Sequence, residues 1–142
     1  MLVRQCLHSA PVTVPPTCTI IEAAELMAQH GVGSLLVVNG GELVGIVTDR
    51  DIAVRGVGGG LGVTEGLASI MTENPVTIQG SADIVEAFVV FKDANARRLP
   101  VMEDTDLAGI ITVDDLLVAL VLEFNAAVAP IVREVVSPEV PA

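Results

Sequence analysis

The chain has 142 residues, of which 51% are hydrophobic and 18% charged, so it is long and apolar enough for one compact domain rather than a disordered segment. Its net charge of -11 argues against binding to a nucleic-acid backbone, and the lack of Trp and Tyr requires an aliphatic core. No apolar run comes near the roughly 18 residues that span a bilayer, and the start lacks a signal-peptide pattern, so a soluble cytoplasmic protein is expected.

The first predicted elements are a short strand and a helix. Val12–Val14 is a β-branched segment after a proline and predicts a strand. Thr19 and Glu22 have the spacing of a capping box, and apolar residues follow at helical intervals. Gly31 suits the left-handed conformation that ends a helix, so we expect the helix to stop there.

A hairpin and a second helix are expected next. Two apolar runs flank an Asn-Gly-Gly turn within residues 35–47, a pattern typical of a β-hairpin. A helix should follow over about 49–55. The glycine-rich run 56–62 comes after that helix and lacks the closing Lys-Ser or Lys-Thr of a phosphate-binding loop. This composition favours a flexible linker over residues 56–66.

The same pattern returns 64 residues later without a gap. Pro11–Val14 returns as Pro75–Ile78, and Gly45–Asp51 returns as Gly109–Asp115. The residues that begin and end the helix differ between the copies but can play the same roles. Asp83 replaces the capping Thr19, Glu86 replaces Glu22, and Asn95 replaces Gly31 in the left-handed position. Pro100 cannot donate to a strand ladder and suggests a sheet edge or a strand start.

This fixed register indicates two copies of one supersecondary unit. We therefore predict an α/β (α+β) fold with one unit at 1–60 and a second at 67–124. The last helix is expected over about 113–124. The remaining tail, 125–142, contains three prolines and a short amphipathic piece at 131–136, and its role is open.

Two pairs of polar residues stand where a buried strand meets a helix start, Thr48 with Asp51 and Thr112 with Asp115. Thr-x-x-Asp is itself a capping box, so helix capping alone would account for either pair. The same geometry suits a ligand, because N–H groups at a helix start attract anions and a carboxylate can accept both hydroxyls of a ribose. The glycine three positions before each threonine would let a ligand approach the strand closely. The two roles are compatible.

Arg97 and Arg98 come directly before a predicted strand. They form either a solvated basic loop or a phosphate site built from guanidinium groups. The aligned segment of the first copy, Gly33–Val37, carries no charge, so the two copies are unequal.

Metal and catalytic chemistry have no support in the sequence. Neither His8 nor His30 has a ligand partner at metal-like spacing, and no nucleophile–histidine–acid set can be assembled. The adjacent acids Asp114 and Asp115 favour compensation of a helix dipole over acid–base work. Cys6 and Cys18 are expected to be reduced thiols, with a disulfide between them left open.

Taken together, these motifs resemble a tandem pair of cystathionine-β-synthase (CBS) motifs. The matching pieces are Ile70–Ile78, Arg97–Val101, Gly109–Leu116 and Thr48–Ile52, within a resemblance that covers about residues 1–124. It implies β-α-β-β-α units related by a pseudo-two-fold axis, packed as one module that commonly forms a homodimer. It also implies a non-catalytic regulatory protein with no catalytic cofactor, whose regulatory ligand is AMP, ADP, ATP or S-adenosylmethionine.

The resemblance further implies two clefts, each formed by both copies. The first would join Thr48, Asp51, Thr77, Ile78, Arg97, Arg98 and Pro100. The second would join Thr13, Val14, Ser34, Leu36, Thr112 and Asp115. The Asp residues would bind ribose, the Thr and Arg residues phosphate, and the apolar side chains adenine. Only the first cleft holds guanidinium groups, so it is the better equipped.

The chain departs from the family pattern at two places. Gln5–His8 replaces the usual Asp-x-Met-Thr run, and Asp49 and Asp114 add negative charge where a polyphosphate would lie. The alternative function is therefore a dimerisation or protein-interaction module with vestigial clefts, which acts on a regulated protein partner. Neither a membrane nor a nucleic acid is expected as a partner.

Overall fold

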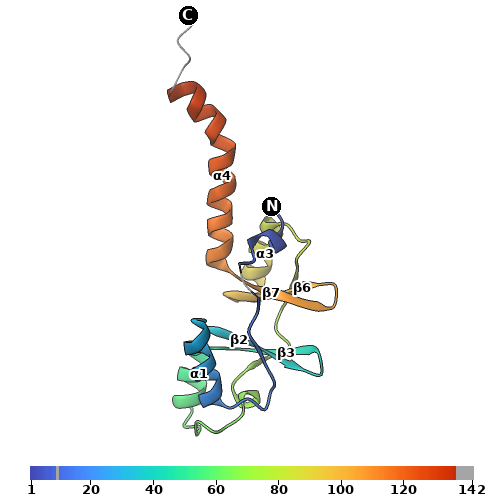
Figure 1. The fold of residues 1–142 in the computed structure, drawn as a ribbon, viewed down its shortest axis with the longest axis vertical. Helices are drawn as coiled ribbons and strands as arrows, with labels where there is room; N and C mark the ends of the chain where they lie inside the picture. Colours follow the sequence, from blue (N-terminus) through green and yellow to red (C-terminus); the bar gives the residue numbers. More distant parts are fainter. Residues whose placement is uncertain (9, 137–142) are drawn as a thin grey trace, which may run out of the picture.

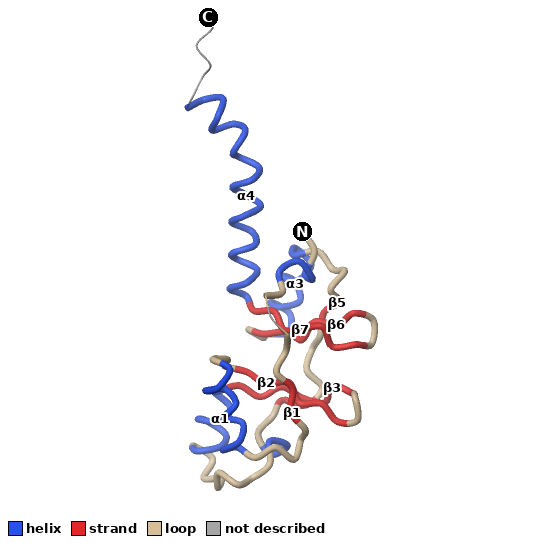
Figure 2. Tube along the Cα trace, viewed as in Figure 1, coloured by secondary structure: helices blue, strands red, loops and turns tan. Residues whose placement is uncertain are grey.

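The computed structural model describes residues 1–8 and 10–136. It has two halves, each a small sheet covered on its outer side by helices, and the two sheets face each other (Figures 1 and 2). The layers run from α1 (Ile20–His30) through the first and second sheets to α3 (Ile84–Ala94). The predicted mixed α/β fold with two repeated units is confirmed.

The first sheet has four strands in the order β1-β2-β3-β4. Their bounds are Thr13–Val14 for β1, Ser34–Asn39 for β2, Glu42–Thr48 for β3 and Thr72–Glu73 for β4. β1 is parallel to β2, and the β2–β3 hairpin and the β3–β4 pair are antiparallel. The predicted hairpin is confirmed, whereas β4 was not predicted and comes from the second copy of the repeat.

The second sheet has three strands in the order β5-β6-β7. Their bounds are Ile78–Gln79 for β5, Arg98–Glu103 for β6 and Asp106–Thr112 for β7. The register repeats that of the first sheet, with Val101 opposite Gly109 where Val37 lies opposite Gly45. The repeat in the sequence is therefore a repeat in space.

Pro100 lies inside β6, the central strand of this sheet, so both the expected sheet edge and the expected strand start are wrong. In the first half, the Leu36 N–H donates to the Val12 carbonyl at 3.0 Å. Pro100 occupies the equivalent position and has no N–H to donate. β5 accordingly begins at Ile78, one residue later than its counterpart β1, and the strand tolerates Pro100 because its β5 pairing starts only at Val101.

The helix caps follow the predicted chemistry. Thr19 and Glu22 form a reciprocal capping box, in which the Thr19 N–H donates to Glu22 Oε2 at 2.9 Å. In the second copy Asp83 caps α3 differently, by accepting a hydrogen bond from the Val85 N–H at 2.9 Å. Gly31 and Asn95 end α1 and α3 with positive φ angles of 63° and 49°.

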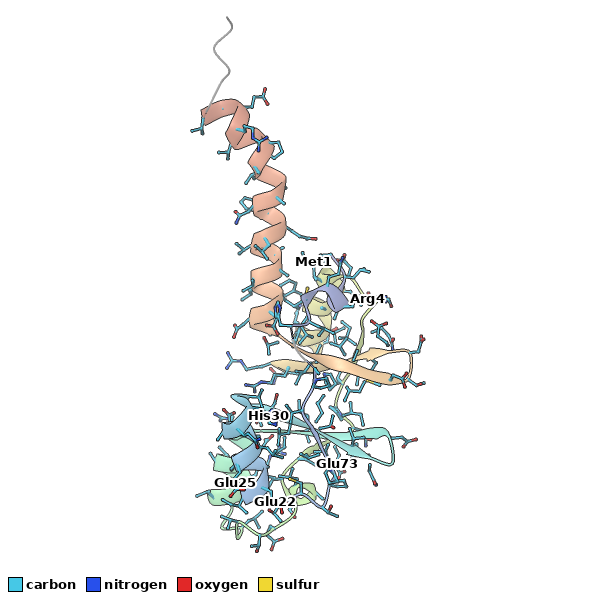
Figure 3. All side chains as sticks on the ribbon, viewed as in Figure 1. Met1, Arg4, Glu22, Glu25, His30 and Glu73 are labelled. Atoms are coloured by element: carbon cyan, nitrogen blue, oxygen red, sulfur yellow. The ribbon has the colours of Figure 1, made fainter. Side chains whose placement is uncertain are left out.

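The leading segments, defined as residues 1–8 and 65–73, are exchanged between the halves. The first contains a 3₁₀ turn, η1 (Val3–Cys6), and Val3 and Cys6 pack in the core of the second half. The second contains η3 (Leu67–Ser69), and Leu67 packs in the core of the first half. Figure 3 shows the result, with Met1 and Arg4 beside the second half and Glu73 beside the first.

Main-chain hydrogen bonds repeat this exchange symmetrically. The Val3 N–H donates to the Ala82 carbonyl at 2.9 Å, and the Leu67 N–H donates to the Cys18 carbonyl at 2.9 Å. Residues 1–60 therefore do not form a unit that is closed on itself, because each copy completes the core of the other.

The glycine-rich run is not the flexible linker that its composition suggested. A short helix, α2 (Asp49–Asp51), continues as a π-helical segment, η2 (Ile52–Val57). The segment continues with hydrogen bonds to the carbonyl five residues earlier. The Gly58 N–H donates to the Ala53 carbonyl, and the Leu61 N–H donates to the Gly56 carbonyl. Gly56 is buried against Ile20 of α1, so this part of the run has a packed position.

The last helix, α4 (Val113–Val136), extends twelve residues beyond the predicted end at Phe124. It takes in the predicted amphipathic piece 131–136, with Pro130 inside the helix, while residues 137–142 lie outside the described part of the chain. α4 projects away from both halves (Figure 1). By length and composition alone it is long and apolar enough to cross a membrane, which contradicts the expectation that no such segment exists.

Candidate ligand-binding cleft

Both predicted Thr–Asp pairs form capping boxes at the point where a hairpin strand passes into a helix. The Thr48 N–H donates to Asp51 Oδ2 at 2.9 Å, and the Asp51 N–H donates to Thr48 Oγ1 at 3.2 Å. In the second half the corresponding distances between Thr112 and Asp115 are 2.8 and 3.1 Å. The capping role of both pairs is confirmed.

Capping leaves part of the Asp51 carboxylate free. Both the N–H and the hydroxyl of Thr48 donate to one oxygen, Oδ2. The other oxygen, Oδ1, lies 3.8 Å from Arg55 Nε. Because each carboxylate oxygen can accept two hydrogen bonds, Oδ1 retains capacity for the hydroxyl groups of a ligand.

Arg98 reaches from the second half to the helix start of the first. A Cβ atom built on Gly33 would lie 3.1 Å from Arg98 Nη2 and 3.2 Å from Asp49 Oδ2. Asp49 opens the short helix that Thr48 and Asp51 cap, and its N–H donates to the Gly33 carbonyl at 3.0 Å. The Arg98 guanidinium of the second half and the Asp49 carboxylate of the first thus both lie beside Gly33, next to the helix start that Thr48 and Asp51 cap.

The strand pairing shows which face of each sheet carries Arg98 and its counterpart Ser34. Arg98 lies opposite Thr112 and Ser34 lies opposite Thr48 in their hairpins. Alternation along β2 turns Leu35 and Val37 toward the core under α1, so Ser34 and Leu36 belong to the opposite face, which meets the other sheet. In the second cleft, Ser34 of the first copy stands where Arg98 of the second copy stands in the first cleft. The second cleft therefore has no guanidinium group at this position.

The remaining residues predicted for the first cleft have diverse environments. Thr77 and Arg97 are exposed, and the Arg97 carbonyl accepts a hydrogen bond from the Val113 N–H at 3.3 Å. Pro100 is buried in β6. Ile78 packs in the core of the second half, so only its main chain could face a ligand.

The residues predicted for the second cleft divide in a similar way. Thr13 is exposed, and Val14 is buried in the core of the first half. Leu36 is fully buried outside the core cluster of either half. The side chains of Val14 and Leu36 are therefore shielded by protein, and of these three residues only Thr13 is accessible to a ligand.

The glycines before the Thr–Asp pairs do not provide space for a ligand. A Cβ on Gly45 would lie 2.5 Å from Met71 Sδ, and one on Gly109 would lie 3.1 Å from both methyl groups of Leu7. Met71 and Leu7 are equivalent positions of the two leading segments. The glycines therefore admit the exchanged segments, and the expected close approach of a ligand at this point is wrong.

A surface pocket of about 650 Å³ lies beside α1. Its walls include Thr13 and Val14 from the predicted second cleft, but otherwise come from α1 and the loop before it. Glu22 and Glu25, labelled in Figure 3, make this pocket acidic, and Glu22 is already engaged in the α1 cap. A phosphate would be repelled here, so we do not assign the ligand to this pocket.

The cysteines are free and buried, one in each half, which settles the open question of a disulfide. Burial raises the pKa of both the Cys6 and the Cys18 thiol, so both are protonated at neutral pH. Among residues 1–8 and 10–136, no group of three His, Cys, Asp or Glu side chains could hold a metal ion.

Comparison with known proteins agrees with this architecture. The CBS-domain family model matches twice, at residues 3–57 and 67–122. The CBS domain-containing protein YhcV of Bacillus subtilis is 35% identical over 116 residues, which cover 82% of this chain and 83% of YhcV. A relative from Methanopyrus kandleri is 37% identical, but the match spans only 56% of its length.

Solved structures share the fold. A CBS domain protein from Pyrobaculum aerophilum complexed with AMP has a TM-score of 0.78 and 26% identity, with 89% of this chain and 99% of that chain covered. A CBS domain pair in complex with 5′-methylthioadenosine and S-adenosyl-L-methionine has a TM-score of 0.76 and 27% identity, with coverage of 87% and 98%. The chain belongs to the CBS-domain family, as a tandem pair of the kind that generally serves as a regulatory module.

Proposed function

We propose that the chain is a non-catalytic sensor that binds an adenosine-containing ligand in the first cleft. The observation that carries the proposal is the placement of the Arg98 guanidinium at the helix start that holds Thr48 and Asp51. Asp51 Oδ1 would accept the ribose hydroxyls, and Arg98 with Thr48 would bind the phosphate. The AMP and S-adenosylmethionine complexes of the two structural neighbours support this ligand class.

Asp49 adds a selectivity element to the proposal. Its carboxylate lies on the same side of Gly33 as the Arg98 guanidinium. A second and third phosphate would bring more negative charge toward this carboxylate, and the one further cation assigned to the cleft, Arg97, lies on an exposed side chain. We therefore expect AMP or ADP to bind more tightly than ATP.

Ligand binding should raise the thermal stability of the protein. At 100 times its dissociation constant a ligand adds about 2.7 kcal/mol. For a chain of this size, that corresponds to on the order of 10 °C in Tm. A thermal-shift series with AMP, ADP, ATP and S-adenosylmethionine measures the effect.

The two capping boxes offer a matched pair of variants. Asp51→Ala and Asp115→Ala each remove the same cap and should each lose about 0.5–2 kcal/mol of stability. Only Asp51→Ala should also abolish the AMP response. Equal AMP responses in both variants, or no response of the wild type to any of the four ligands, would contradict the first cleft as the site.

Arg98→Gln separates phosphate binding from nucleoside binding. The affinity of this variant for AMP should be about tenfold or more lower than that of the wild type, because a charge-assisted hydrogen bond is lost. Binding of 5′-methylthioadenosine, which has no phosphate, should change little. Isothermal titration calorimetry measures both affinities.

The second candidate is an interaction module with vestigial clefts, favoured by the exposed apolar side chains of α4. Mass spectrometry of the purified protein distinguishes the two candidate functions, because a retained nucleotide would count against the interaction module with vestigial clefts. A cytoplasmic location, a homodimeric state and a regulated protein partner are further parts of the proposal.

A further inference from the structure

Arg55 links the proposed ribose acceptor of the first cleft to one of the exchanged leading segments. It lies in η2, one helical turn after Asp51. Its Nη1 donates to the Ile70 carbonyl at 3.1 Å, and its Nε lies 3.8 Å from Asp51 Oδ1. Ile70 belongs to the leading segment 65–73, so the guanidinium group contacts both a helix start of the first copy and a segment of the second.

The Ile70 carbonyl gives the Arg55 guanidinium a fixed anchor. Ile70 is 1% exposed and packs in the core of the first half together with Leu67. Its N–H donates to the Leu67 carbonyl at 3.0 Å, which ties its main chain into a tight turn. The Arg55 side chain is 53% exposed, and without an anchor a side chain of this length would sample many rotamers. The contact with Ile70 therefore holds a positive charge at a defined place beside Asp51.

The Asp51 carboxylate needs two restraints to keep one orientation. The torsion that turns an Asp carboxylate is broad, so a single contact leaves the plane of the group loosely set. Thr48 restrains Oδ2 through two donors, at 2.9 and 3.1 Å. Arg55 attracts Oδ1, and an acid followed four residues later by a base is the favourable order for such a pair on a helix. At 3.8 Å the Arg55 Nε does not occupy a hydrogen-bonding position on Oδ1, which stays open to a ligand.

The second half lacks this arrangement. At the repeat spacing of 64 residues, Arg55 aligns with Ala119 and Ile70 aligns with Cys6. Ala119 and Cys6 are both buried in the core of the second half, so apolar packing stands where the first half has a charge. Within residues 1–8 and 10–136, Asp115 makes no ion pair. Its second carboxylate oxygen therefore lacks the cationic restraint that Asp51 has.

We infer that Arg55 is a positioning residue of the first cleft, which orients Asp51 Oδ1 toward the ribose hydroxyls of the ligand. This role rests on the proposed function, because it requires a nucleoside at Asp51. It makes the two clefts unequal in ribose binding as well as in phosphate binding. Arg55 is not placed to bind the phosphate itself, because Arg98 lies at the helix start whereas Arg55 lies about 5.4 Å further along the helix and is held by Ile70.

Isothermal titration calorimetry of the full chain with two ligands tests this role. AMP carries both ribose hydroxyls, and 2′,3′-dideoxy-AMP carries neither. Arg55→Gln should lower the affinity for AMP about threefold to fivefold, the modest effect of a half-exposed ion pair, and should leave the affinity for dideoxy-AMP unchanged. Arg50→Gln is the matched control, because it removes the same charge from an exposed position on the same short helix. It should change neither affinity by more than about twofold.

A charge-conserving variant separates positioning from general structural support. Arg55→Lys keeps a positive charge beside Asp51 and should restore AMP binding to near the wild-type affinity. Equal losses of AMP and dideoxy-AMP affinity in Arg55→Gln, or no recovery in Arg55→Lys, would overturn the role of Arg55 and leave the proposed function standing. No binding of AMP by the wild type would overturn both.

Discussion

At the scale of single residues, the repeated glycines have a structural role. Gly45 and Gly109 begin the two Gly-x-x-Thr-x-x-Asp motifs, and each lies under an apolar side chain of an exchanged leading segment. A Cβ on Gly45 would meet both Met71 Sδ and the Thr72 carbonyl oxygen, at 2.5 and 3.1 Å. The motif therefore keeps its glycine because of packing within the protein.

Gly45→Ala should destabilise the protein by about 1–3 kcal/mol, the usual cost of overpacking. Met71 can move its sulfur, but the carbonyl of β4 is main chain and cannot move without disturbing strand pairing. Urea unfolding measures the loss. Gly62→Ala is the control, because a Cβ at Gly62 would contact nothing within 4 Å, and its effect should stay within about 0.5 kcal/mol.

At the scale of elements, the two equivalent helices are capped by different chemistry. Thr19 caps α1 with a neutral hydroxyl, whereas Asp83 caps α3 with a carboxylate. The hydrogen bond from the Val85 N–H lowers the pKa of Asp83, with help from the nearby Met1 amine. Of these two equivalent helices, only α3 therefore has an N-cap residue that is itself charged.

The Asp83 cap should make the protein sensitive to acid. A lowered pKa means that the folded state favours the carboxylate, so this contribution is present above the ordinary value of 3.8 and is lost as the pH falls through the folded pKa. Asp83→Asn keeps a capping side chain without the charge and should flatten the fall of Tm below pH 4 relative to the wild type. Parallel Tm curves for the two proteins would contradict this assignment.

At the scale of the whole molecule, the exchanged leading segments join the halves into one cooperative unit. Leu67 and Ile70 belong by sequence to the second copy but complete the core of the first half. Val3 and Cys6 do the reverse. Neither half has a full core without a segment of the other, so the halves should not unfold separately.

Leu67→Ala should cost about 2–5 kcal/mol, as expected for a fully buried leucine. The protein should still unfold in one transition, and amide hydrogen exchange should rise in both β2 and β6. Val76→Ala is the control, since Val76 is half exposed and contributes to neither core. Separate transitions for the two sheets would show that the halves are independent.

The sequence by itself determined the features that depend on local chemistry. Thr19 with Glu22, the Asn-Gly-Gly turn and the two apolar runs beside it specify helix starts, turns and strands within a few residues, and the structure confirms them. The repeat also determined that the halves are alike, because the same local signals recur 64 residues apart. The inequality of the two clefts is likewise a property of the sequence, since Arg98 of one copy aligns with the uncharged Ser34 of the other.

Only the tertiary structure decided the features that depend on contacts distant in the chain. The exchange of leading segments, the burial of Gly56 and the packing role of Gly45 all arise from contacts between residues that no local pattern relates. Pro100 entered a central strand because its missing N–H falls just before β5 begins to pair. The length of α4 was likewise underestimated, since Pro130, one of the three prolines of the tail, lies inside a helix that continues to Val136.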